Sequence, residues 1–340
     1  MKLPFKVVMV ASEGQRMPDW VPQRLKNHGI DFSVHICDTS EQVIERAGDA
    51  NVIWVFGGSK VVASHTLPKL KRCQAILRSG SGTDNIPVAE ATELGIVVAN
   101  TPEAVTVGVA VHTIALLITT AQQIVQQDRA LHTEAWDRAC NYSASQLAGR
   151  TLGLIGFGRI AQLVAQRARP FKLNLIAFDP LIDPAVMAEY TVQPTEFDDL
   201  LQQSDFISLH CPLLDQTHHL IGQPQLKQMQ SHAVLINTSR GPVIDEAALV
   251  HALNEKWIAA AALDVFESEP LLPDSPLLQL DTVILTPHIS SYTDVFLDDF
   301  WSHSILTLIE LSQNRWPFWC VNPNVKPRVP LSREQTSHSL

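Results

Sequence analysis

One glycine-rich segment, residues 151–161, constrains the fold of this 340-residue chain more than any other. An apolar run, Thr-Leu-Gly-Leu-Ile, leads directly into Gly156-Phe-Gly158-Arg-Ile-Ala161, and a helical pattern follows it. This order is typical of a strand, a tight turn and a helix in a parallel α/β sheet. Gly156 permits the turn, Gly158 lets the backbone approach a phosphate, and Ala161 lets the helix pack on the strand. The free N–H groups at such a helix N-terminus attract anions.

An acidic residue after the next expected strand extends this pattern to a dinucleotide-binding site. Asp179 follows the apolar run 174–178 and stands 18 residues beyond Ala161. A carboxylate at this place accepts hydrogen bonds from ribose hydroxyls and repels a 2′-phosphate. We therefore expect the chain to bind NAD in preference to NADP. The alternative is a turn that only joins a strand to a helix.

Strand-like and helix-like segments alternate along most of the chain. The expected strands are 6–10, 32–36, 51–56, 74–78, 151–155, 174–178, 206–210, 233–237, 259–263 and 283–286, and the expected helices are 20–27, 40–47, 106–127, 159–167, 196–203, 247–254 and 295–313. Near-continuous apolar strands that alternate with amphipathic helices indicate a parallel sheet covered on both faces. At roughly 150 residues per domain, the length favours two α/β domains.

Composition excludes several classes of function. The 25 basic and 35 acidic side chains give a net charge of −10, which disfavours nucleic acid as a partner. Five scattered cysteines without CxxC spacing, and histidines without an HExxH motif, argue against a disulfide framework and a metal site. The apolar run 7–11 is too short for a secretory signal, and the apolar run 105–121 contains His112, so we expect a buried helix there. A cytoplasmic protein without a membrane partner is expected.

Polar residues follow three of the expected strands, where ligands bind in open α/β sheets. The three segments are 237–241, 263–270 and 285–291, and they supply Arg240, Glu269 and His288. An imidazole that titrates near neutrality suits general acid–base work, a guanidinium holds a carboxylate bidentately, and a carboxylate orients and charges the imidazole. Each residue alone has a plain alternative: a surface cation, a solvated loop acid, or a histidine beside a proline turn.

Taken in order, these segments resemble the D-isomer-specific 2-hydroxyacid dehydrogenases. This family includes phosphoglycerate dehydrogenase, glyoxylate/hydroxypyruvate reductase and the C-terminal-binding proteins, and the stretches around residues 209–212, 267–270 and 320–322 look most like the last branch. The resemblance covers residues 51–322, and the matching segments are 78–85, 100–102, 151–161, 210–212, 237–241, 262–266 with 269–270, and 286–288.

The resemblance implies a fold, a cofactor and an assembly. It implies two doubly wound parallel-sheet domains: a Rossmann NAD domain, 102–295, inserted into a flavodoxin-like substrate domain, 1–101 and 296–325. The polar composition of residues 326–340 predicts a mobile tail. Members of the family are typically homodimers, and their contacts involve the long helix after residues 100–102 and the arm that contains Trp136.

The resemblance also implies roles for individual residues. Arg240 would bind the substrate carboxylate and carbonyl, and Glu269 would pair with His288, the general acid/base. The implied NAD contacts are Ser81, Gly156, Gly158, Arg159, Ile160, Asp179, Cys211, Pro212, Thr238, Ser239, Arg240, Asp264, His288 and Ser291. The implied substrate contacts are Phe56, Gly57, Ser79, Gly80, Ser81, Gly82 and Arg240, with backbone N–H groups of residues 79–82 on the carboxylate.

Three departures from the family pattern bear on the substrate. Val111 stands where the family often has Glu, Phe56 where phosphoglycerate dehydrogenases carry an arginine, and Ser291 where the C-terminal-binding proteins carry a tryptophan. Burying a phosphate without a cation is costly, so we expect small or medium uncharged 2-oxo acids as substrates. The expected activity is hydride transfer between NAD(H) and a 2-oxo acid or D-2-hydroxy acid. The alternative is a regulatory or scaffolding protein that senses NAD(H).

Overall fold

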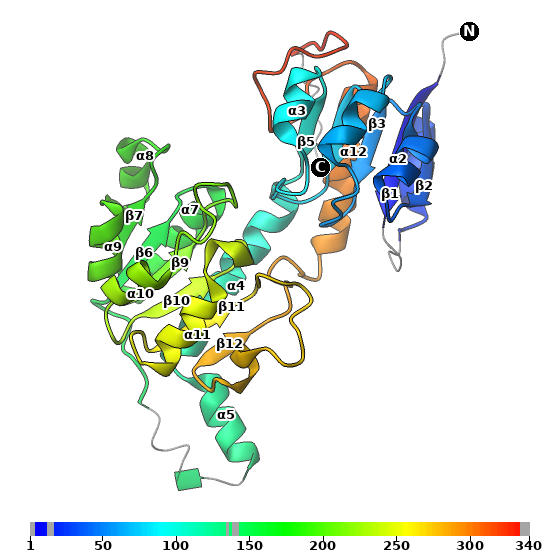
Figure 1. The fold of residues 1–340 in the computed structure, drawn as a ribbon. Coiled ribbons are helices and arrows are strands. Elements are labelled where there is room, and N and C mark those ends of the chain that lie inside the picture. The colour runs from blue at the N-terminus through cyan, green and yellow to red at the C-terminus, as the bar shows by residue number, and fades with distance from the viewer. Residues whose placement is uncertain (1–3, 12–16, 134–135, 138–142, 334–340) are drawn as a thin grey trace. The chain divides into compact units, whose positions relative to one another are not determined.

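The computed structural model describes residues 4–11, 17–133, 136–137 and 143–333 of the chain, and these residues form two compact units (Figure 1). The first unit comprises Met1–Val105 together with Thr293–Leu340, and the second comprises Thr106–Tyr292. The second unit is therefore inserted in the sequence between the two segments of the first. Both units are α/β, as the sequence predicts.

The first unit is built on a five-stranded parallel sheet. Its strands are β1 (Phe5–Ala11), β2 (Ile30–Ile36), β3 (Val52–Val55), β4 (Ala75–Arg78) and β5 (Val97–Asn100), in the order β2-β1-β3-β4-β5. Its helices are α1 (Trp20–Asn27), α2 (Ser40–Ala47), the 3₁₀ helix η1 (Ser64–Lys69), α3 (Val88–Glu93) and α12 (Phe296–Ser312). This strand order is that of flavodoxin-like doubly wound sheets.

The second unit is built on a seven-stranded parallel sheet. Its strands are β6 (Thr151–Ile155), β7 (Asn174–Phe178), β8 (Gln193–Pro194), β9 (Phe206–Leu209), β10 (Val234–Asn237), β11 (Ala260–Leu263) and β12 (Val283–Leu285), in the order β12-β11-β10-β9-β6-β7-β8. The order of winding reverses between β6 and β9, as in the Rossmann fold. Ligands bind at such a switch point.

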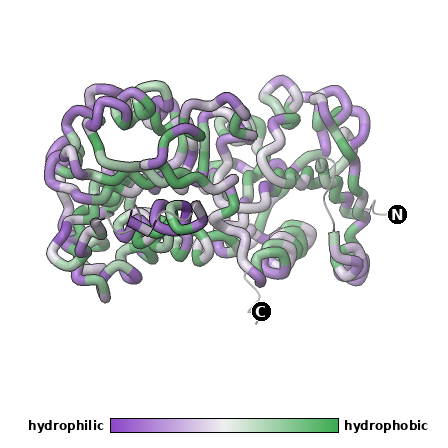
Figure 2. Tube along the Cα trace, turned by 90° about the horizontal axis from the view of Figure 1, so that it is seen from below, coloured by the Kyte–Doolittle hydropathy of each residue, from purple (hydrophilic) through white to green (hydrophobic). Residues whose placement is uncertain are grey.

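Helices cover both faces of this second sheet. They are α4 (Glu103–Ala121), α5 (Ile124–His132), α7 (Arg159–Ala168), α8 (Pro184–Glu189), α9 (Phe197–Gln203), α10 (Gln223–Gln228) and α11 (Glu246–Asn254), with the 3₁₀ helices η2 (Arg169–Phe171), η3 (Gly241–Val243) and η4 (Pro276–Gln279). Adjacent residues of a strand point to opposite faces of the sheet and so belong to different hydrophobic cores. Leu235 packs with α9, α10 and α11, whereas Ile236 packs with α4 and α7. Figure 2 shows the apolar stretches along the strands inside each unit.

The structure divides the helix that was expected over residues 106–127. Helix α4 ends at Ala121, Gln123 adopts a left-handed conformation with φ of 52°, and α5 starts at Ile124. By length and apolar composition α4 could cross a bilayer, but 67% of its most apolar 18-residue window is buried, as in the core helix of a folded domain. The α-helices α3, α8 and α10, the strands β5 and β8, and the four 3₁₀ helices were not expected from the sequence.

Residues 326–333 do not form the mobile tail that their composition suggests. The guanidinium of Arg328 donates to the backbone carbonyls of Leu94, Leu70 and Cys73, and the Arg328 N–H donates to the Gly95 carbonyl. These bonds join the segment to the β4–β5 side of the first unit. The remainder of the expected tail, 334–340, lies outside the described residues.

Candidate active site

A carboxylate–imidazole pair forms in the second unit, beyond the carboxyl ends of β11 and β12. Nδ1 of His288 lies 2.7 Å from Oε2 of Glu269. The side chains are 47% and 36% exposed, so both are accessible to a ligand. Because Nδ1 is engaged by the carboxylate, Nε2 is the nitrogen that can exchange a proton with a reacting group.

The surroundings of Glu269 keep its carboxyl ionised. Burial raises the pKa of Glu269, but the hydrogen bond and charge of His288, the Phe266 N–H and the charge of Arg240 outweigh it, and the net pKa lies below the ordinary value. The Phe266 N–H donates to Oε1 of Glu269 at 3.1 Å. At neutral pH the carboxylate therefore carries a negative charge that stabilises a protonated imidazole.

His288 itself sits in an unusual backbone conformation. Its φ of 52° is left-handed, which costs a residue with a Cβ about 1–2 kcal/mol. Its N–H donates to the carbonyls of Asp264 (2.8 Å) and Thr286 (3.0 Å). Such a conformation persists only where the surrounding structure over-determines it, and it is typical of functional sites.

The carboxylate of Asp264 fixes the turn around His288. Asp264 is fully buried, and its oxygens accept hydrogen bonds from the Thr286 hydroxyl (2.6 Å) and from the backbone N–H groups of Ile289 and Ser290 (both 3.0 Å). Asp264 was expected as a cofactor contact. The structure shows it as the anchor of the segment that carries His288.

Arg240 lies in the turn that follows β10, and packed backbone holds this turn in place. Oδ1 of Asn237 accepts the Ser239 N–H and hydroxyl, and its amide donates to the Arg240 carbonyl. A Cβ on Gly241 would lie 1.9 Å from the carbonyl carbon of Phe266, so only glycine fits there. The backbone of the Arg240–Gly241 turn therefore packs against the start of the loop that carries Glu269, and the Arg240 charge contributes to the lowered pKa of Glu269.

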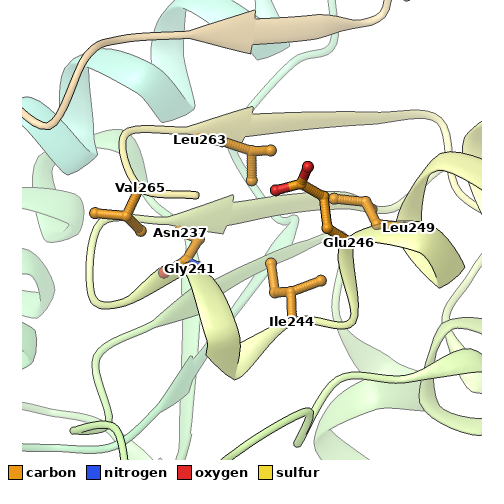
Figure 3. A pocket seen from close by; sticks show the side chains of 7 residues that line it. All are labelled: Asn237, Gly241, Ile244, Glu246, Leu249, Leu263 and Val265. Atoms are coloured by element: carbon orange, nitrogen blue, oxygen red, sulfur yellow. The ribbon is translucent and has the colours of Figure 1, made fainter. Parts of the chain in front are cut away.

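Little empty space lies beneath this turn. Figure 3 shows a small pocket between the Arg240–Gly241 turn, the end of β11 and the start of α11, with the Glu246 carboxylate among its apolar walls. Its volume of about 10 Å³ has room for roughly one water molecule. The turn that carries Arg240 therefore rests on a well-packed base.

The glycine turn fits a dinucleotide. Gly156 has a φ of 87°, and a Cβ there would lie 2.8 Å from the backbone of His210 and Cys211. A Cβ on Gly158 would meet nothing within 4 Å, so the protein alone does not require a glycine at that position. Close approach of a ligand to the backbone at the start of α7 would explain the glycine at position 158. Arg159 is the first residue of this helix.

Two backbone N–H groups hold the carboxylate of Asp179 beside the glycine turn. Its Oδ2 accepts the Phe157 N–H at 2.8 Å and its Oδ1 accepts the Leu181 N–H at 2.9 Å. The carboxylate thus stands next to the glycine turn in a fixed orientation. This is the arrangement that ribose hydroxyls require.

The segment that follows β9 lies against the glycine turn, at the point where the order of winding reverses. Burial raises the pKa of the Cys211 thiol to about 11 and lowers the pKa of His210 to about 3. At neutral pH the thiol is protonated and the imidazole is neutral, so neither serves as a nucleophile or a charged ligand contact. His210 and Cys211 present their backbone to the glycine turn, as the Gly156 contact indicates.

The remaining expected NAD contacts of the second unit lie around the same strand ends. Thr238 is buried and its hydroxyl lies 2.9 Å from that of Thr113 on α4. Ile160, the second residue of α7, is half-buried and packs against the core of the unit. Ser291 lies against α4, where a Cβ on Gly108 would be 3.1 Å from its carbonyl oxygen.

In the first unit, residues 79–82 form the loop that was expected to bind the substrate, and two of its backbone N–H groups donate to other protein groups. The Ser79 N–H donates to the Val55 carbonyl and the Gly80 N–H donates to the Thr101 hydroxyl. The Ser79 hydroxyl is buried between Trp54 and Ser304. Of the four backbone donors expected at 79–82, those of Ser81 and Gly82 have no acceptor in the described part of the chain, so they are the pair left for a ligand.

Phe56 follows β3 and belongs to an aromatic cluster. Its ring centroid lies 4.7 Å from that of Phe300 and 5.3 Å from that of Trp301, both on α12. Gly57 has a φ of 66°, and the Asn85 amide donates to the Gly57 carbonyl at 3.3 Å and to the Ser59 carbonyl at 2.7 Å. The loop at the end of β3 is therefore fixed, and its wall is aromatic.

Comparison with known proteins agrees with this geometry. Residues 114–290 match the family model described as "D-isomer specific 2-hydroxyacid dehydrogenase, NAD binding domain". A D-3-phosphoglycerate dehydrogenase of Methanocaldococcus jannaschii is 43% identical over 257 residues, 75% of this chain and 48% of that protein. A glyoxylate reductase of Thermofilum pendens is 36% identical over 323 residues, 93% of this chain and 89% of that protein.

A solved structure is similar over almost the whole chain. The D-lactate dehydrogenase of Aquifex aeolicus, complexed with NAD and lactic acid, has a TM-score of 0.81 and 28% identity, covering 90% of this chain and 95% of that one. The chain spans about half the length of the phosphoglycerate dehydrogenases it matches. On these matches and the site described above, the chain belongs to the D-isomer-specific 2-hydroxyacid dehydrogenase family, and residues 114–290 are its NAD-binding domain.

Proposed function

We propose that the protein is an NAD-dependent oxidoreductase that interconverts a small 2-oxo acid and its D-2-hydroxy acid. The observation that carries this proposal is the 2.7 Å pair of Glu269 and His288, with Arg240 beside it, at the strand ends of an NAD-binding domain. These three side chains meet the separate needs of a carbonyl reduction: a proton donor, a charge that maintains it, and a cation for the substrate.

The glycine turn at Gly156 and Gly158 and the Asp179 carboxylate would hold NADH, which would supply the hydride for the reduction. His288, protonated and oriented by Glu269, donates a proton from Nε2 to the carbonyl oxygen, so that no free alkoxide is released. Arg240 binds the substrate carboxylate and polarises the carbonyl. In the first unit taken by itself, Ser79 and Gly80 donate their N–H groups to other protein groups, so the Ser81 and Gly82 N–H groups are the ones we assign to ligand binding within the 79–82 loop.

The substrate side chain is assigned to the wall that Phe56 and Gly57 form. Phe56 packs among aromatic rings of the first unit, and no cation belongs to this cluster within the described residues. A phosphate needs a charged partner when it loses water. Uncharged side chains of small or medium size suit this wall better than a phosphorylated one.

We also infer a homodimer, on the apolar surface of the second unit. Val107 and Val111, one turn apart on α4, are 54% and 50% exposed. Ile124 and Leu131 on α5 are 49% and 46% exposed, and Trp136 is 69% exposed. Apolar side chains of this size on neighbouring helices favour a protein partner. A second copy of the chain is the occupant we propose.

A panel of 2-oxo acids tests the substrate class. We expect NADH oxidation, followed by absorbance, with glyoxylate, hydroxypyruvate and a branched or thioether 2-oxo acid. Phosphohydroxypyruvate should have a kcat/KM at least about tenfold lower, a difference of ~1.4 kcal/mol. A preference for the phosphorylated acid would contradict the assignment of Phe56.

The same panel separates the enzyme from its alternative, an NAD(H)-sensing regulatory protein that resembles the C-terminal-binding proteins. Such a protein would bind NADH tightly and turn over none of the acids. That result would overturn the proposed activity, because the Arg240, Glu269 and His288 set would then serve no chemical step.

The Glu269–His288 pair gives a second prediction. His288→Ala should leave the Kd for NADH within about twofold and lower kcat by about 10²–10⁴-fold, the usual cost of losing a general acid. Glu269→Gln should move the pH above which reduction fails downward. Reduction needs the protonated imidazole of His288. The lowered pKa of Glu269 keeps its carboxylate charged throughout the working pH range, so replacing it with an uncharged amide removes this negative charge at every pH tested.

Glu267→Gln is the matched control for this experiment. Glu267 lies in the same loop but pairs with His219 instead of His288. Its pH profile should equal that of the unaltered protein. A profile that moves equally in both variants, or in neither, would remove Glu269 from the role proposed here.

Asp179 gives a third prediction, on the choice of cofactor. The unaltered protein should prefer NADH to NADPH, because the carboxylate repels a 2′-phosphate. Asp179→Asn should lower the ratio of kcat/KM for NADH to that for NADPH by about tenfold or more, ~1.4 kcal/mol. Asp183→Asn, which changes the N-cap of α8 four positions later, should leave the ratio unchanged. Equal use of both cofactors by the unaltered protein would refute the assignment.

A further inference from the structure

Helix α4 contacts all three loops of the active site within the second unit. Thr113 bonds to Thr238 in the Arg240 segment, and Gly108 packs against the backbone of Ser290 and Ser291 in the His288 segment. His112 reaches Thr286 and, at 3.8 Å, the carboxylate of Asp264 at the start of the Glu269 segment. These contacts come from adjacent turns of one helix that is packed in the core of the unit. Helix α4 therefore supports the catalytic loops from behind.

The contact of His112 is directional. Nε2 of His112 lies 3.0 Å from the Thr286 hydroxyl oxygen and 3.8 Å from Oδ1 of Asp264. The Thr286 hydroxyl gives its only proton to Asp264, at 2.6 Å. Its oxygen must then accept from His112, which assigns the proton of this contact to Nε2.

This contact begins a chain of hydrogen bonds that ends at the catalytic turn. His112 donates to Thr286, Thr286 donates to Asp264, and Asp264 accepts the N–H groups of Ile289 and Ser290, which directly follow His288. The Asp264 carboxylate is fully buried and His112 is about one quarter exposed. Among the described residues, Asp264 is the charged group that faces His112.

We propose that His112 is a positioning residue for the proton-transfer step: its hydrogen bond to Thr286 fixes the Asp264 carboxylate, which in turn holds His288 in its left-handed conformation. The proposal rests on the proposed function, since it assigns a task in that same reaction. A small misplacement of a catalytic group lowers the rate of the chemical step strongly. The glycine turn and Asp179 lie at other strand ends and do not contact His112, so we expect the loss of its hydrogen bond to affect the chemical step more than the affinity for NADH.

Two substitutions at His112 test this. His112→Leu fills similar space but has no N–H, and we expect it to lower kcat about tenfold with the Kd for NADH within about twofold. His112→Gln places an amide N–H near the position of Nε2 and should stay within about threefold of the unaltered kcat. His28→Leu, the same change at an exposed site in the first unit, should have no effect.

A second measurement does not depend on activity. Amide hydrogen exchange at Ile289 and Ser290 should be about tenfold faster in His112→Leu than in the unaltered protein, and near normal in His112→Gln. In a double-mutant cycle, adding His112→Leu to Thr286→Val should change the exchange rates little further, because His112 acts through the Thr286 hydroxyl.

The outcomes separate this proposal from the proposed function. If the unaltered protein reduces no 2-oxo acid, the function fails, and the exchange rates still decide the role of His112. Unchanged exchange at Ile289 and Ser290 in His112→Leu would overturn the proposal. So would a His112→Gln variant as impaired as His112→Leu, or a loss confined to NADH binding, because either result indicates space-filling instead of positioning.

Discussion

The buried carboxylate of Asp264 is the interaction on which the arrangement of the active site depends. It is fully inaccessible, yet it accepts three hydrogen bonds, all from the segment around His288. Without those bonds the left-handed histidine would relax, since that conformation is unfavourable for a residue with a Cβ. The same strand end leads into the loop of Glu269, so one buried group organises both members of the pair.

The rest of the site follows from parallel-sheet geometry. Parallel strands end at a common edge, and the polar residues that follow β10, β11 and β12 therefore gather there. The glycine turn after β6 and the Cys211 segment after β9 meet where the winding reverses, which is where a dinucleotide binds. In the function that we propose, the ends of β6 and β7 bind the cofactor, and the segments after β10, β11 and β12 supply the cation, the carboxylate and the proton donor.

Ten of the twelve strands in the described residues could be predicted from the sequence, because each is a short apolar run, and the structure confirms that Arg240, Glu269 and His288 follow the ends of such strands. Sequence reasoning could not tell which donors would remain for a ligand. Ser79 and Gly80 looked equivalent to Ser81 and Gly82, but Val55 and Thr101 accept the first two N–H groups. It also missed the break at Gln123, the hold of Arg328 on the first unit and the task of Asp264, since all three depend on contacts between distant residues.

The most direct test of the account is the fate of a labelled hydride. Reduction of glyoxylate cannot reveal handedness, so a chiral product is needed, such as that of a branched 2-oxo acid. With NADH deuterated at C4 of the nicotinamide on the transferred face, we predict a D-2-hydroxy acid that carries one deuterium at C2. An L or racemic product, or tight NADH binding without any transfer of deuterium, would contradict the central claim.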